Sequence, residues 1–173
     1  MTDVHAIEPH ASVGGILPGA QFVDAYRVTV EAGGLDAVAA ARLMLERPPA
    51  WIQRLMALRN ALVTPFGLKT GPEASDRRPK IGMFPIESES PGRVVLGFDD
   101  KHLDFRVVVD VAAAGAASEV TATTLVRRHN LLGRAYLTTI LPFHKLIVRA
   151  SLSGVAARRL GRSAGLAGSR GRA

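Results

Sequence analysis

Alternating apolar and polar residues mark a series of strands along this chain. In the segment Phe22–Val30, Tyr26, Val28 and Val30 lie on one side and polar side chains lie on the other, which predicts a first strand. Further strand-like runs follow in quick succession at Ile81–Ser88, Arg93–Asp99, Leu103–Val111 and Glu119–Arg128. Their connections are short, and a parallel crossover needs roughly a dozen residues or more, so these runs can pair only as antiparallel hairpins.

The run Leu103–Val111 alternates most clearly. Its odd positions are all apolar, whereas Asp104, Arg106 and Asp110 occupy even positions. This pattern predicts that one side of the strand faces a core and that the other side is wetter. The predicted sheet therefore has an apolar face that needs a cover.

Helical spacing of apolar residues replaces the alternation in three other stretches. Leu35–Glu46 predicts an alanine-rich helix that must end at Pro48-Pro49, because proline lacks the amide hydrogen that a helix interior needs. A second apolar stripe covers Trp51–Val63. The third and longest extends over about Leu131–Leu160 and contains Pro142, which we expect to kink it.

The order of these elements predicts one α+β domain. A strand and two helices come first, then the antiparallel strands, and finally a long helix whose apolar stripe matches the uncovered face of the sheet. We expect a curved sheet wrapped around this C-terminal helix, over residues 17–153. Residues 1–16 lack periodicity and predict a flexible arm, and residues 154–173 predict a basic, disordered tail.

Charge and composition narrow the classes of function. The net charge is +7, but residues 154–173 carry five arginines and no acid, so the rest of the chain is nearly neutral. A nucleic-acid-binding module usually carries its basic patch on the fold, so we expect no specific nucleic-acid partner. Cysteine is absent, which excludes disulfides, thiolate nucleophiles and zinc–thiolate sites. Neither a signal peptide nor an apolar run of membrane-spanning length is evident, so we expect a soluble, cytoplasmic protein.

Short motifs between residues 17 and 149 resemble those of a bacterial family. They are LPGA at 17–20, LRNAL at 58–62, PFG at 65–67, GFDDKHLDFR at 97–106, HNLLGR at 129–134 and PFH at 142–144. These motifs are similar to the domain of unknown function 2867. The order of elements also resembles the helix-grip fold of the START and Bet v 1-like (SRPBCC) superfamily. That resemblance implies a hydrophobic cavity between the sheet and the last helix, and hence an apolar small molecule as partner.

Domains similar to this one also occur fused behind short-chain-dehydrogenase-like modules. The resemblance therefore implies a dehydrogenase-like protein as a further possible partner. The chain itself lacks a strand followed by a GxGxxG turn, so a dinucleotide site is not supported and we expect no cofactor.

Two groups of polar residues are candidates for chemistry. His144 lies on the apolar stripe of the last helix, where it could act as a general acid or base, or could be a core histidine bonded to backbone groups freed by Pro142. Asp100, His102 and Asp104 alternate in a dense polar turn and could ligate a cation. A solvated hairpin turn explains them more simply, so we expect no metal.

Two basic candidates, Arg59 and the segment 127–130, each allow a ligand-binding and a structural interpretation. Arg59 interrupts an apolar helix and could hold a ligand carboxylate bidentately, or could pair with Asp104 or another acid. The segment Arg127-Arg128-His129-Asn130 precedes the last helix and fits either an anion site at a helix N-terminus or a simple Asn130 N-cap, which we favour.

These candidates lead to three hypotheses of function. The first is a module that binds a mostly apolar ligand, lipid or polyketide-like, in a cavity of roughly 300 Å³ or more. Its predicted lining is Leu103, Phe105, Val107, Leu137, Ile140 and His144, with Arg59 or His102 fixing a polar end. The second is a cyclase- or hydratase-like enzyme that uses His144 with Asp104 or Asp100. The third is a domain that binds a dehydrogenase-like partner.

Overall fold

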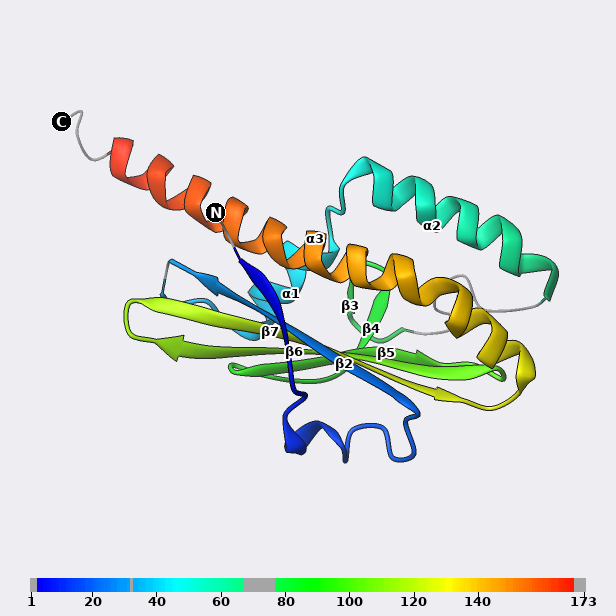
Figure 1. The fold of residues 1–173 in the computed structure, drawn as a ribbon. Coiled ribbons are helices and arrows are strands. Elements are labelled where there is room, and N and C mark those ends of the chain that lie inside the picture. Colours follow the sequence, from blue (N-terminus) through cyan, green and yellow to red (C-terminus); the bar gives the residue numbers. More distant parts are fainter. Residues whose placement is uncertain (1–2, 32, 67–76, 170–173) are drawn as a thin grey trace.

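A seven-stranded antiparallel sheet forms the base of the molecule (Figure 1). The computed structural model describes residues 3–31, 33–66 and 77–169. The strands are β1 (Val4–Ile7), β2 (Phe22–Val30), β3 (Lys80–Ile81), β4 (Phe84–Ser90), β5 (Arg93–Asp99), β6 (Leu103–Ala114) and β7 (Ala117–Arg128). They lie in the order β1-β2-β7-β6-β5-β4-β3, so β2 crosses over to pair with the last strand.

The three α-helices all lie on one side of this sheet (Figure 1). They are α1 (Ala37–Leu45), α2 (Ala50–Val63) and α3 (Leu131–Ser169), and two short 3-10 helices are η1 (Ala11–Val13) and η2 (Thr64–Phe66). Helix α1 is capped at its N-terminus by Asp36, whose carboxylate accepts a hydrogen bond from the Ala39 amide at 2.7 Å. Helix α3 begins after Asn130, whose side-chain oxygen accepts from the Gly133 amide at 3.0 Å, as expected of an N-cap.

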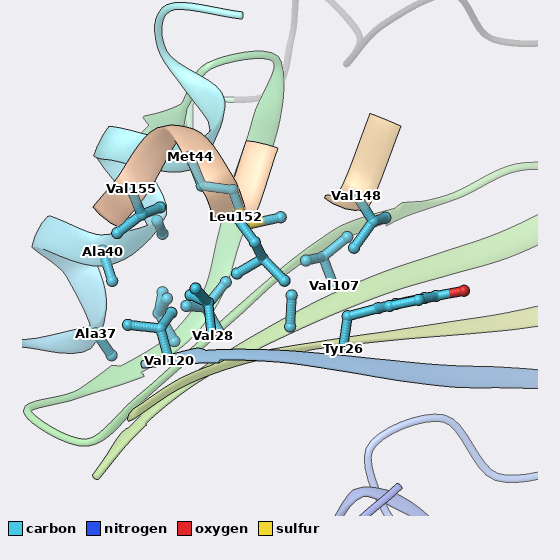
Figure 2. Packing of buried hydrophobic residues seen from close by; sticks show 14 of the residues in the cluster. Tyr26, Val28, Ala37, Ala40, Met44, Val107, Val120, Val148, Leu152 and Val155 are labelled. Carbon is cyan, nitrogen blue, oxygen red and sulfur yellow. The ribbon is translucent and has the colours of Figure 1, made fainter. Parts of the chain in front are cut away.

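The main core lies between the sheet, α1 and the C-terminal half of α3 (Figure 2). From α3, Val148, Leu152 and Val155 are buried against residues of β2, β6, β7 and α1. Leu152 and Val155 have no exposed surface. The long terminal helix is therefore held on the sheet by its own apolar stripe, and the predicted α+β fold with a curved antiparallel sheet is confirmed.

The N-terminal segment differs from the sequence prediction. Residues 4–7 form β1 instead of a flexible arm, and they pair with β2 in the register Val4↔Val28. η1 and the following turn cover the other face of the sheet, where Val13 and Leu17 are buried against Val108. This cover explains why Val108 is apolar on a side of β6 that the alternation predicted to be wet.

Two further boundaries also differ. The predicted strand Ile81–Ser88 is divided into β3 and β4 by a turn at Gly82, whose φ is +60°. A Cβ there would lie 2.8 Å from the carbonyl oxygen of Leu45, so the turn packs directly on the end of α1. The chain was expected to fray after Gly154, but α3 continues to Ser169, and residues 170–173 of the predicted tail lie outside the described residues.

One helix of the described chain, the Leu131–Arg159 stretch of α3, is long and apolar enough to cross a membrane by length and composition alone. In the fold, part of the apolar surface of this helix packs against the rest of the domain. Val148, Leu152 and Val155 pack into the core, and Pro142 lies in its interior. This stretch therefore packs across the sheet as a covering helix.

Candidate functional site

A cavity of about 160 Å³ lies between α2, the N-terminal half of α3 and the sheet. Its walls are mostly apolar side chains from β2, β4, β5, β6, β7 and both helices. The residues that line it are Phe22, Met56, Arg59, Met83, Phe84, Phe98, Leu103, Phe105, Thr124, Val126, Tyr136, Leu137, Ile140, His144 and Ile147. Helix α2 contributes Met56 and Arg59, so this helix borders the space on the side away from the sheet.

Three phenylalanines form one wall of the cavity. Phe84, Phe98 and Phe105 come from the neighbouring strands β4, β5 and β6, and Phe98 lies directly opposite Phe105 in the ladder. The Phe84 and Phe105 ring centroids are 5.5 Å apart, and those of Phe98 and Phe105 are 5.9 Å apart. Aromatic rings at these separations attract one another, so they form a rigid surface that suits a flat apolar ligand.

His144 is one of the polar groups at the cavity. Its Nε2 lies 3.1 Å from Oδ1 of Asp24 on β2, and its ring meets that of Phe22 edge-on with centroids 5.8 Å apart. The two side chains are 15% and 17% exposed. The second oxygen of Asp24, Oδ2, is buried and has no hydrogen-bond partner among the described residues. Burial, and then the negative charge of Asp24, raise the pKa of Tyr26 two residues along the strand.

Asp24 was not identified from the sequence. It corrects the expectation that Asp104 or Asp100 partners His144, and it also replaces the backbone partner of the alternative interpretation. A signal was present, because Asp24 has the same parity as Phe22 and Tyr26 and therefore lies on the apolar face of its strand. A carboxylate on a covered face needs a partner.

Arg59 is the second polar group at the cavity. Its Nε donates to the Tyr136 hydroxyl at 2.9 Å, and its guanidinium carbon lies 5.1 Å from the centre of the Tyr136 ring. Its Nη1 donates to Oδ1 of the adjacent Asn60 at 2.9 Å. The predicted clamp on Asp104 is absent, since Asp104 pairs with other bases.

Asp104 lies in a separate cluster at the start of β6. Arg127 donates to its Oδ2 through Nε at 2.9 Å and Nη2 at 2.6 Å, and Nε2 of His129 lies 3.0 Å from Oδ1. Burial alone would raise the pKa of Asp104, but the hydrogen bonds from His129 and Arg127 outweigh burial and lower it. Arg127 and His129 are thus engaged by this carboxylate, and Asn130 serves as the helix cap instead of completing an anion site.

The polar turn before β6 is a hairpin turn. The Asp100 amide donates to the Leu103 carbonyl at 3.0 Å, and the strand begins only at Leu103, so Asp100 and His102 do not alternate along it. No group of three or more His, Cys, Asp or Glu residues that could hold a metal ion occurs in the part of the chain that the structure describes.

Most of the predicted ligand-binding residues border the cavity, and two do not. Arg59, Leu103, Phe105, Leu137, Ile140 and His144 line it. Val107 is buried in the main core. His102 lies against the start of α3, where its Nδ1 is 3.0 Å from the side-chain nitrogen of Asn130. The alternation of β6 could not separate Val107 from Phe105, because both lie on the same face and the helices packed over that face decide which of them is in the core.

The fold and the site together define an α+β domain in which a curved sheet, a long terminal helix and α2 border a small, partly open cavity with an aromatic wall. The chain belongs to the family described as Protein of unknown function (DUF2867), whose model matches residues 16–151. The matched range covers every strand except β1 and includes all the cavity-lining residues. No curated protein and no solved structure matches the chain.

Proposed function

We propose that this domain binds a small, mostly apolar molecule in the cavity between α2, α3 and the sheet. The observation that supports the proposal is the lining itself, which combines three contacting phenylalanine rings with only a few polar side chains. Ligand sites of proteins typically have this composition, with apolar walls and a few polar groups that fix orientation. The resemblance to the START and Bet v 1-like superfamily favours the same function.

The size of the cavity restricts the ligand. Its volume of about 160 Å³ is smaller than the roughly 300 Å³ at the lower end for ordinary ligand pockets. An apolar cavity of about 150 Å³ in another protein accommodates benzene. The part of the ligand inside the cavity is therefore of the size of a single ring, and the proposal narrows from a lipid or polyketide-like compound to a smaller molecule.

Binding of toluene to the purified chain tests this proposal. We expect saturable shifts of the Leu137 and Ile140 methyl signals in NMR spectra, because both residues line the cavity. An Ile140→Trp variant should fill the space and abolish these shifts while its circular dichroism stays native. The matched control is Leu146→Trp on the same helix, where the leucine is 59% exposed and lies outside the lining. Absence of saturable shifts in the unmodified chain would refute the proposal.

A second candidate function is acid–base catalysis in the same cavity. The observation that favours it is the contact between His144 and Asp24, since a carboxylate bonded to one imidazole nitrogen fixes the tautomer and leaves the other nitrogen to exchange a proton. The reaction class is cyclase- or hydratase-like, with His144 as base and Asp24 as its orienting group.

Cinnamate, a ring-sized unsaturated acid, is a suitable probe for this second function. If water is added across its double bond, NMR should detect the hydroxy acid, and both His144→Gln and Asp24→Asn should slow the reaction while leaving the fold and toluene binding intact. Equal loss of thermal stability in both variants without any turnover by the unmodified chain would indicate a structural histidine.

A further inference from the structure

Arg59 brings a positive charge into contact with an otherwise apolar cavity. It is half-buried on α2, and no carboxylate pairs with it among the described residues. Apart from His144, every other side chain in the cavity lining is uncharged. A partly desolvated guanidinium is stabilised by an anion at hydrogen-bond distance.

The contacts of Arg59 leave donors available for such an anion. Its Nε bonds to Tyr136 and its Nη1 bonds to Asn60, whereas no described residue accepts from its Nη2. The Tyr136 hydroxyl accepts the Nε hydrogen, so its own hydrogen can be donated to another group. The guanidinium edge and the phenol therefore provide adjacent donors at one place in the cavity.

The other polar pair determines where a negative charge would lie. Asp24 carries a carboxylate beside His144, with one buried oxygen that has no hydrogen-bond partner among the described residues. A ligand anion would be repelled there and attracted at Arg59. The single positive charge of Arg59 matches the single negative charge of a carboxylate.

We propose that the ligand of this cavity is a monocyclic aromatic carboxylate. Its carboxylate accepts hydrogen bonds from Arg59 and Tyr136, and its ring lies against Phe84, Phe98 and Phe105. The volume of about 160 Å³ accommodates one ring with a short acidic side chain. This inference rests on the proposed function and adds the chemical class of the ligand.

The proposal of an aromatic carboxylate ligand is tested on the full chain by titration calorimetry with phenylacetate and by NMR titration with toluene. We expect phenylacetate to bind to the unmodified chain. Arg59→Leu should lower the affinity for phenylacetate roughly tenfold or more, while its affinity for toluene stays within about twofold of the unmodified chain. Tyr136→Phe keeps the ring and should weaken phenylacetate by a smaller factor. The matched control is Arg54→Leu, which removes the same charge from an exposed position on the same helix and should leave both affinities unchanged.

The outcomes separate the two proposals. Toluene binding without phenylacetate binding, or equal binding of phenylacetate and benzylamine, would overturn the carboxylate assignment and leave the apolar site intact. Failure of both ligands would overturn the site itself. If Arg59→Leu does not fold, Arg59→Lys and Tyr136→Phe provide the test, and unchanged phenylacetate affinity in both would also overturn the assignment.

Discussion

At the scale of single residues, Asp104 shows how one buried carboxylate joins distant parts of the chain. Its side chain is 4% exposed, and it receives hydrogen bonds from Arg127 and His129 at the end of β7. These partners hold the last strand against the first residues of β6, immediately before α3 begins. The cluster therefore fixes the point at which α3 leaves the sheet.

We expect Asp104→Asn to lower the free energy of unfolding at pH 7 by about 2 kcal/mol, since hydrogen bonds to charged groups contribute about that much. The pKa of Asp104 is lowered in the folded state, so its contribution is complete above the ordinary value of 3.8 and is lost as pH falls through the folded value. Urea unfolding at pH 7, 5 and 3 measures this. The unmodified chain should lose more stability on acidification than the variant.

The control for this prediction is Asp3→Asn, because Asp3 is exposed near the N-terminus. It should leave the pH profile of the unmodified chain unchanged. An Asp104→Asn profile parallel to that of the unmodified chain over the whole range would contradict the assigned role.

The candidate site could be predicted from the sequence only where the signal is local. The apolar stripe containing His144 and the N-cap Asn130 depend on neighbours within a few residues, so both were recognised. The pairing of His144 with Asp24 joins residues 120 positions apart. It depends on how α3 lies across β2, and strand alternation gives no information about that crossing.

At the scale of elements, the difference between local signals and contacts of distant residues also explains which helices and strands could be predicted. The strands of the meander and the three helices have clear periodicity, and their existence was predicted correctly. β1 has only four residues, too few for alternation to be recognised. Its role is to cover the edge of β2, which would otherwise expose unpaired backbone groups.

Gly133 in the first turn of α3 gives a prediction at this scale. A Cβ at this position would lie 2.1 Å from the carbonyl oxygen of His102, so α3 begins in backbone contact with the turn before β6. We expect Gly133→Ala to destabilise the domain by about 1–3 kcal/mol, as overpacking does. Thermal denaturation followed by circular dichroism measures the change.

Gly154 in the same helix is the matched control. An added Cβ there meets no atom within 4 Å, so Gly154→Ala should stabilise the helix by up to about 1 kcal/mol. If Gly133→Ala lowered the stability less than a surface substitution does, the turn before β6 and the start of α3 would be able to move apart easily, and the prediction would be wrong.

At the scale of the whole molecule, α3 has two roles along its length. Its N-terminal half contributes Leu137, Ile140 and His144 to the cavity. Its C-terminal half contributes Leu152 and Val155 to the main core. The sequence predicted one continuous apolar stripe and could not distinguish the two halves, because leucine, isoleucine and valine have the same pattern in a wall as in a core.

We expect Leu152→Ala to destabilise the domain by about 2–5 kcal/mol, because its side chain is fully buried and its removal leaves a cavity in the core. Leu146→Ala, on the exposed side of the same helix, should change stability by less than about 0.5 kcal/mol. Chemical denaturation of both variants compares them directly. Similar losses of stability in the two variants would mean that the C-terminal half of α3 does not hold the helix on the sheet.

This division of α3 has a consequence for how members of the family can diverge. Substitutions at Leu137 or Ile140 alter the shape of the cavity, while the residues that anchor the helix on the sheet lie about two to five turns further along and are left untouched. Under the proposed function, single exchanges in one half of this helix would therefore change the ligand without requiring compensating changes in the other half.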